Sequence, residues 1–213
     1  MKIGSNEWSE LIINGARFFD LDLDRHHTEL FAAHAKELLH WNNTINLTTI
    51  TDPFEVAVKH FVDSLAPAKR ISPGASLLDI GSGSGFPGIP LKIVLPSLAV
   101  TLIDASRKRV NFLKHVIRTL KLEDIQALHI RAEDLADDPA YRQHFDTITS
   151  RALTDLKSFI RQARPLLTAK GQMIALKGRM DQTEAETVRS SILAVETYML
   201  PFTDSKRSVF LIQ

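Results

Sequence analysis

The chain has 213 residues, of which 44% are hydrophobic and 24% charged, with a formal net charge of +1 and no cysteine. This length and composition fit a globular protein with one substantial core, and the missing cysteine excludes disulfides, thiolate zinc sites and cysteine-held iron–sulfur clusters. Because no apolar run is long enough to span a bilayer and the first residues lack a secretory pattern, we expect a cytoplasmic protein without a membrane partner.

The first part of the chain, residues 1–70, is predicted to form a layer of three helices. Apolar residues recur at helical spacing in segments 5–20 and 26–40, and a third helix starts at Pro53, a residue tolerated in a first helical turn. A polar loop rich in asparagine and threonine separates the second helix from the third. A Ser-Pro-Gly turn closes this layer, so residues 71–213 are predicted to form a second domain.

The second domain begins with the stretch 77–104, which reads LLDIGSGSGFPGIPLKIVLPSLAVTLID. It contains an apolar segment of strand length, a glycine-rich turn, a helix and a second apolar segment. This succession opens a doubly wound sheet, in which ligands bind beyond the carboxyl ends of the strands. The glycines at positions 81, 83 and 85 allow a ligand to approach the backbone closely.

Two registers of the glycine turn predict different ligands. Read from Gly83, the turn has the GxGxxG spacing of nicotinamide and flavin proteins, but the strand ends two residues earlier, at Gly81. In the register from Gly81, Asp79 lies at the mouth of the turn, where a carboxylate repels a diphosphate and suits a positively charged ligand. S-adenosylmethionine is such a ligand, and Asp104 would take its ribose hydroxyls. We therefore favour S-adenosylmethionine, with a nucleotide-dependent dehydrogenase as the alternative.

The remainder of the chain alternates strands with helices. Strands are predicted at residues 125–130, 145–149, 171–176, 194–200 and 208–212, and helices begin at about residues 106, 154 and 181. An acidic loop is expected after Glu133. The alternation predicts an α/β fold with a mainly parallel, doubly wound sheet, whose last two strands form an antiparallel edge.

Charged residues at the predicted strand ends are candidates for a binding site. They are Asp79, Asp104, Glu133, Arg151 and Lys177. The carboxyl ends of parallel strands form the ligand crevice of an open sheet, although each charge alone could equally be a surface residue or a helix cap. The motifs GxSxG, HExxH and GxxxxGK[ST] do not occur, so we expect neither esterase nor phosphate-loop chemistry, and no metal site.

Seven segments resemble one family, the bacterial 16S ribosomal RNA (guanine-N7) methyltransferases of the G type, also called glucose-inhibited division protein B. They stand in family order: WNNTINLTTI at 41–50, HFVDSL at 60–65, LLDIGSGSGFPGIPL at 77–91, VTLIDASRKRVNFL at 100–113, RAED at 131–134, FDTITSRAL at 145–153, and PLL with ALKG within 165–178. The GFPGIPL and SRA parts are far more specific than the glycine turn.

The resemblance implies a Rossmann-like, S-adenosylmethionine-dependent enzyme that methylates N7 of a guanosine in the decoding-region loop of 16S ribosomal RNA. Its partner would be this RNA or the small ribosomal subunit. The cofactor contacts that the family implies fall on Gly81, Phe86, Ala132, Glu133 and Arg151. The turn itself adds Asp79, Gly83 and Gly85, and the ribose argument adds Asp104 at the end of the second strand.

Guanine N7 carries a free lone pair, so its methylation requires no general base. Arg151 and Lys177 are predicted as the catalytic residues, holding guanine O6 or a phosphate. Asn46, His60 and Asp63 match family positions without an assigned role, and we expect the first two to bind RNA. Further cations expected to neutralise the RNA backbone are Arg107, Lys108, Lys114, Arg118, Lys157 and Arg161, unless they form only a solvated helix surface.

Two other functions remain open. A methyltransferase-like module could bind cofactor or RNA without turnover, and an enzyme of the same fold could methylate a small molecule. No coiled-coil pattern or long apolar face indicates an obligate dimer, so we expect a monomer.

Overall fold

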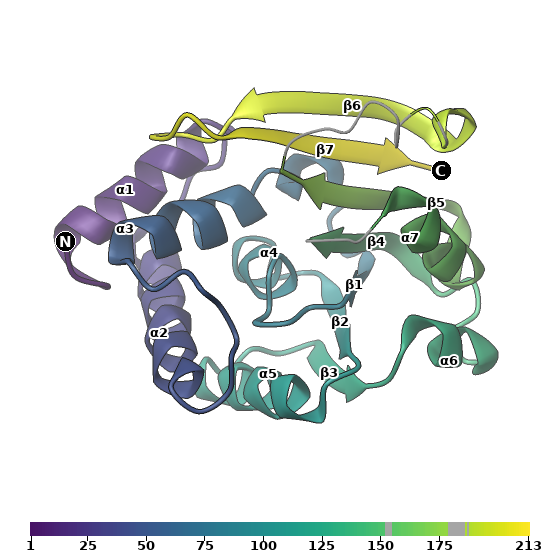
Figure 1. Cartoon of the computed structure of the whole chain (residues 1–213), viewed down its shortest axis with the longest axis horizontal. Helices are drawn as coiled ribbons and strands as arrows, with labels where there is room; N and C mark the ends of the chain where they lie inside the picture. Colours follow the sequence, from purple (N-terminus) through teal and green to yellow (C-terminus); the bar gives the residue numbers. More distant parts are fainter. Residues whose placement is uncertain (152–154, 179–185, 187) are drawn as a thin grey trace.

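The structure, a computed structural model, describes residues 1–151, 155–178, 186 and 188–213. Within these ranges seven strands form one sheet in the order β3-β2-β1-β4-β5-β7-β6 (Figure 1). The strands are β1 Ser76–Ile80, β2 Ala99–Asp104, β3 Ile125–His129, β4 Phe145–Arg151, β5 Leu167–Lys177, β6 Ile192–Met199 and β7 Lys206–Ile212. Neighbours from β3 to β5 pair in parallel, and β7 is antiparallel to both β5 and β6. The predicted doubly wound α/β fold with an antiparallel edge is confirmed.

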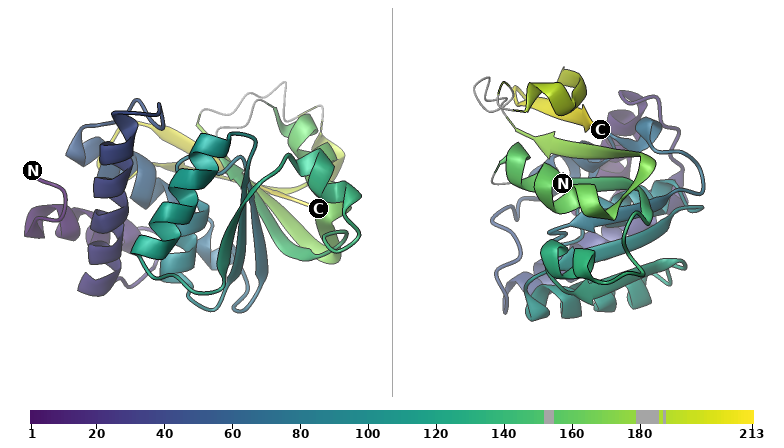
Figure 2. Two further views of the ribbon diagram at one scale, coloured as in Figure 1. Left: turned by 90° about the horizontal axis from the view of Figure 1, so that it is seen from below. Right: turned by 90° about the vertical axis from the view of Figure 1, so that its right-hand side faces the viewer.

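Helices cover both faces of the sheet, giving three layers (Figure 2). The helices are α1 Asn6–Arg17, α2 Arg25–Asn42, α3 Pro53–Glu55, α4 Gly88–Val94, α5 Arg107–Thr119, α6 Ala132–Asp137 and α7 Leu156–Ala163. Helix α3 continues as the π-helical segment Val56–Val62, and short 3-10 turns occupy Ala68–Arg70, Arg164–Leu166 and Arg189–Ser191. None of the helices in the described ranges is long and apolar enough to cross a membrane.

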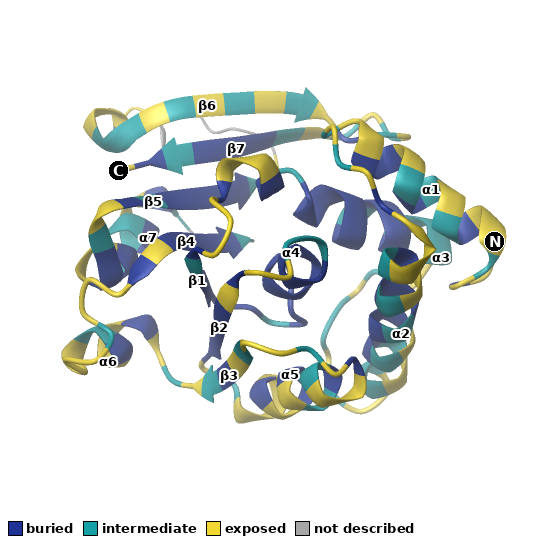
Figure 3. Cartoon of the chain, turned by 180° about the vertical axis from the view of Figure 1, so that it is seen from behind, coloured by how far each residue is buried: buried dark blue, intermediate teal, exposed yellow. Residues whose placement is uncertain are grey.

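The alternation of side chains along the strands creates two apolar clusters, one on each face of the sheet. Leu77 faces a cluster that also contains Trp8, Phe31 and Phe61 from the N-terminal helices, whereas the next residue, Leu78, faces the cluster formed with α6 and α7. Figure 3 shows β1, β4 and α4 mainly in dark blue, the colour of buried residues. The N-terminal layer and one sheet face therefore share a core, and a domain boundary at residue 70 stays a prediction.

The predicted helix starts are confirmed in the N-terminal layer. The Ser5 hydroxyl accepts a hydrogen bond from the Trp8 amide at 3.3 Å, and Asp52 caps the helix that begins at Pro53. These side chains satisfy amides that lack a partner in the first helical turn.

The acidic loop predicted after Glu133 is wrong, because Ala132–Asp137 is a short helix. Glu133 and Asp134 occupy its first turn, where carboxylates are stabilised by the positive end of the helix dipole. Strand β5 begins at Leu167, four residues earlier than the predicted start at residue 171. Most of the helix predicted from residue 181 lies outside the described residues.

Candidate active site

The glycine-rich turn follows β1 directly, as predicted. Gly81, Gly83 and Gly85 have φ values of +69°, +58° and +91°, a left-handed backbone region that glycine adopts without strain. A Cβ atom built on Gly81 would meet no described atom within 4 Å, whereas one built on Gly85 would lie 2.5 Å from Ile89 Cδ1. The turn is therefore open to a ligand at Gly81 and tightly packed at Gly85.

Asp79 lies buried beneath this turn, at the end of β1. Its Oδ2 accepts a hydrogen bond from the Gly88 amide at 3.1 Å, and its Oδ1 has no hydrogen-bond partner among the described residues. Burial raises the pKa of Asp79 to about 7, and nearby Asp104 adds to the rise while Arg151 opposes it. A buried, unpaired carboxylate oxygen favours a positively charged ligand.

This buried carboxyl group makes stability depend on pH. Its pKa of about 7 in the folded protein, against an ordinary value of 3.8, means that the folded state holds the proton more tightly. The contribution of neutral Asp79 to the free energy of unfolding therefore falls as the pH rises from about 4 to about 7. Above about pH 7 this contribution changes little. We expect the Asp79→Asn variant to gain stability relative to wild type over this range.

Urea unfolding at several pH values measures this difference. The exposed Asp22 provides a matched Asp22→Asn control, which keeps Asp79 and should therefore show the same pH slope as wild type. Equal pH slopes for wild type and Asp79→Asn would contradict the assigned environment.

Asp104 at the end of β2 ties this strand to the glycine turn. Its Oδ2 accepts from the Gly83 amide at 3.0 Å and its Oδ1 from the Ser106 amide at 2.7 Å. Each carboxylate oxygen has two lone pairs, so these bonds leave acceptor capacity for ribose hydroxyls. The ribose role of Asp104 stays a prediction.

His34 of α2 holds the other side of the turn. Its Nε2 lies 2.9 Å from the Ser84 carbonyl oxygen, which only accepts, so Nε2 carries the proton. Its ring stacks on Phe86, with centroids 4.8 Å apart, and burial lowers its pKa to about 4. Sequence reasoning missed His34, because its contact with Ser84 joins residues 50 positions apart.

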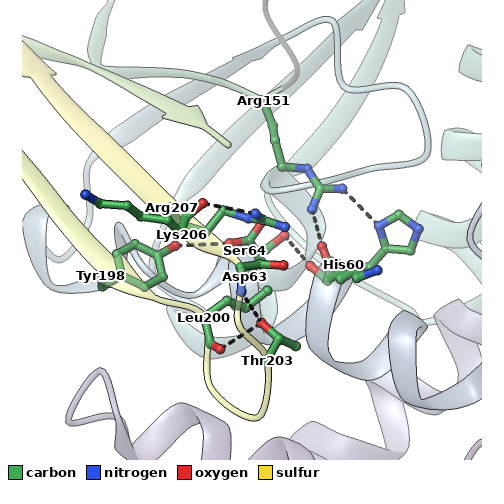
Figure 4. Close-up of polar contacts among 11 residues, drawn as sticks. His60, Asp63, Ser64, Arg151, Tyr198, Leu200, Thr203, Lys206 and Arg207 are labelled. Carbon is green, nitrogen blue, oxygen red and sulfur yellow. Dashed lines mark hydrogen bonds and ion pairs between the residues drawn. The ribbon is translucent and has the colours of Figure 1, made fainter. Parts of the chain in front are cut away.

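Arg151 ends β4, and Figure 4 shows its guanidinium pointing toward His60 of the N-terminal layer. Its Nη1 donates to the Lys59 carbonyl at 3.0 Å and its Nη2 to His60 Nδ1 at 3.2 Å. The guanidinium carbon lies 4.9 Å from the centre of the Phe86 ring, within cation–π range. Arg151 is therefore held rigidly next to the glycine turn.

His60 is a partner of Arg151 and is buried, although the sequence predicts it as an RNA-binding residue. Because Nδ1 accepts from Arg151, Nε2 carries the proton and donates to Thr48 Oγ1 at 2.9 Å. Burial, followed by the charge of Arg151, lowers the pKa of His60 to about 3. His60 is thus neutral near pH 7, and both ring nitrogens are occupied.

A cavity of about 380 Å³ opens beside Arg151, at the carboxyl ends of β4 and β5. Its walls are formed by Ile50, Lys59, His60, Asp63, Arg151, Leu176, Lys177, Gly178, Tyr198 and Arg207. The structure thus brings together the predicted catalytic residues Arg151 and Lys177. It adds Tyr198 and Arg207 from the antiparallel edge, which the sequence did not single out.

Asp63 is the carboxylate of this cavity. Its Oδ1 accepts from the Tyr198 hydroxyl at 3.0 Å, and its Oδ2 from Arg207 Nε at 3.3 Å (Figure 4). Burial, followed by the Asp63 charge, raises the pKa of Tyr198, so this phenol stays protonated and donates. Lys59 on the cavity wall pairs with Glu55 at 2.5 Å.

The other predicted site residues lie outside the cavity. Ala132 and Glu133 begin α6. Glu133 Oε1 accepts a hydrogen bond from Gln162 Nε2 at 2.8 Å. A hydrogen bond from the Glu133 backbone amide, followed by the bond from Gln162, lowers the pKa of Glu133. The remaining predicted RNA-binding residues are all exposed: Asn46 in the loop after α2, Arg107, Lys108, Lys114 and Arg118 on α5, and Lys157 and Arg161 on α7.

Sequence comparisons point to one family. The family model described as "rRNA small subunit methyltransferase G" (GidB) matches residues 27–210. A "Ribosomal RNA small subunit methyltransferase G" from Desulfitobacterium hafniense is 48% identical over 165 residues, covering 78% of this chain and 69% of that protein. A protein of the same name from Geobacter metallireducens is 41% identical over 210 residues, covering 95% of this chain and 94% of its own length.

Solved structures with the same fold are more distant in sequence. A SAM-dependent methyltransferase from Aquifex aeolicus superimposes with a TM-score of 0.57 at 17% identity, covering 76% of this chain and 94% of that chain. A fibrillarin/Nop5p complex chain gives a TM-score of 0.55 at 13% identity, covering 67% of this chain and 74% of that chain. At these identities the likeness shows the fold alone.

Proposed function

Since this chain belongs to the rRNA small subunit methyltransferase G (GidB) family, we propose that it transfers a methyl group from S-adenosylmethionine to N7 of a guanosine in the decoding-region loop of 16S ribosomal RNA. The observation that carries this proposal is the junction of two features at one sheet edge. The glycine turn lies above an Asp79 oxygen that has no hydrogen-bond partner among the described residues, and it adjoins the cavity through Arg151.

The residues around the turn fit a cationic cofactor. Gly81 leaves its backbone accessible, and the unpaired Oδ1 of Asp79 is an uncompensated acceptor that a sulfonium or ammonium group would balance. Asp104 would hold the ribose, and Ala132 with Glu133 the adenine. The cofactor supplies an electrophilic methyl group.

The protein's own contribution to this reaction is alignment and electrostatics. Guanine N7 attacks with its free lone pair, so no side chain has to remove a proton. The state of His60 agrees with this, because its nitrogens are both engaged and its pKa lies near 3. Arg151 and Lys177 hold guanine O6 or a phosphate, which fixes N7 in line with the methyl group.

The partner is 16S ribosomal RNA or the small ribosomal subunit, and the enzyme acts as a cytoplasmic monomer. Exposed cations on α5, the helix that follows Asp104, neutralise the RNA backbone. Asn46 belongs to the loop that precedes the cavity residue Ile50, a position from which it can meet the RNA.

RNA affinity is expected to fall steeply with salt. Each phosphate contact contributes a slope of about 0.7 to 0.9 in log affinity against log salt. We expect a variant with glutamine in place of four α5 cations, Arg107, Lys108, Lys114 and Arg118, to bind RNA more weakly. Its affinity should also depend less steeply on salt. Filter binding between about 50 and 200 mM salt measures this, with a Lys2→Gln, Arg17→Gln control. A flat slope for wild type would contradict phosphate tracking by this helix.

The proposed function is tested by incubating the protein with methyl-labelled cofactor and small subunits that lack the modification. Label on N7 of a single 16S guanosine is the expected result. Unlabelled RNA with intact cofactor binding would indicate a binding module without turnover. Label on free nucleosides or metabolites as well would indicate a small-molecule methyltransferase.

A further inference from the structure

We propose that Asp63 determines base specificity by accepting hydrogen bonds from the Watson–Crick edge of the target guanine inside the cavity. This inference rests on the proposed function and assigns the group that distinguishes guanine from other bases. At about 380 Å³ the cavity falls within the range of about 300 to 1,000 Å³ that small-molecule sites occupy.

The chemistry of guanine matches a carboxylate. Its Watson–Crick edge presents two adjacent donors, N1–H and N2–H₂, whereas adenine places an acceptor, N1, beside its amino group. An ionised aspartate only accepts, so it pairs with the guanine edge and repels the adenine acceptor. N7 lies on the opposite side of the purine, so reading this edge leaves N7 free for methyl transfer.

The surroundings of Asp63 keep its carboxylate fixed and ready to accept. Tyr198 and Arg207 each donate a hydrogen bond to one oxygen, which locks the side chain in place. Each oxygen retains a further lone pair. Because Tyr198 and Arg207 lie on the paired strands β6 and β7, the carboxylate rests on rigid elements.

Arg151 links Asp63 in the cavity to the glycine turn. The Arg151 guanidinium interacts electrostatically with both Asp63 in the cavity and Asp79 beneath the turn, and it lies over Phe86 of the turn. A base held at Asp63 would thus extend along Arg151 toward the turn. The cations Lys59, Lys177 and Arg207 on the walls can balance the phosphate of the same nucleotide.

The test compares small subunits that carry either guanosine or inosine at the target position. Inosine keeps N7, O6 and N1–H and lacks only the N2 amino group. For wild type we expect kcat/KM to be about tenfold or more higher on guanosine, as for loss of one good base contact. For Asp63→Asn we expect a lower kcat/KM on guanosine and a guanosine-to-inosine ratio near one, with cofactor affinity unchanged.

An Asp22→Asn control should keep the wild-type ratio. Equal wild-type rates on the two substrates would overturn the proposal without any variant, and so would an Asp63→Asn variant that preserves the preference. A folding defect in the variant would lower both rates and leave their ratio intact, so the ratio separates base reading from a structural role. If wild type labels neither substrate, the proposed function itself fails, and this inference fails with it.

Discussion

Replacing Gly85 with alanine is expected to cause the largest loss of stability among single substitutions in the glycine turn. The residue has φ +91°, where a non-glycine residue costs about 1 to 3 kcal/mol. The added Cβ would also lie 2.5 Å from Ile89 Cδ1 and 3.3 Å from His34 Cε1, and such overpacking typically costs about 1 to 3 kcal/mol more. The displaced turn should no longer bind S-adenosylmethionine.

Gly74 offers a matched control for this substitution. Its φ is +74°, and a Cβ atom there would meet no described atom within 4 Å, so Gly74→Ala carries the backbone strain without the collision. Urea unfolding should show a clearly smaller loss for Gly74→Ala, and calorimetry should show unchanged cofactor binding. Equal losses for the two variants would contradict the tight packing assigned to the turn.

Replacing Arg151 with alanine is expected to reduce turnover by about a hundredfold to a thousandfold, the usual cost of removing a donor that stabilises a transition state. The substitution also leaves His60 Nδ1 and the Lys59 carbonyl without their Arg151 donors, and it removes the cation above Phe86. Arg151→Lys should recover only part of the rate, because an ammonium group lacks the planar fork.

Single-turnover methylation of small subunits at saturating RNA and cofactor measures this effect. The exposed Arg17, whose side chain donates a hydrogen bond to its helical neighbour Asn14, supplies an Arg17→Ala control that should behave as wild type. Wild-type turnover by Arg151→Ala would show that this residue has no catalytic role.

The parts of the fold that depend on local patterns could be predicted from the sequence. The strand ending at Ile80, the glycine turn and the strand ending at Asp104 follow from apolar runs and glycine spacing, which act over a few residues. Helix α6 could not be predicted, because its six residues are too few to show a helical period. Its acidic first turn reads as a loop until the helix dipole is considered.

The candidate site was only partly predictable for a related reason. Strand-end charges such as Arg151 and Lys177 were found, since topology alone brings parallel strand ends to one edge. The partners of Asp63 were not, because Tyr198 and Arg207 lie 135 and 144 residues away and reach it only through the antiparallel edge. The contact of His34 with the turn likewise depends on how the helical layer docks on the sheet.

The central claim is that the glycine turn above Asp79 binds a positively charged sulfur donor and excludes a diphosphate. Calorimetric titration of the protein with S-adenosylmethionine and, separately, with NAD tests it directly. We predict saturable binding of S-adenosylmethionine and no measurable binding of NAD. Tight binding of NAD together with no binding of S-adenosylmethionine would contradict the account.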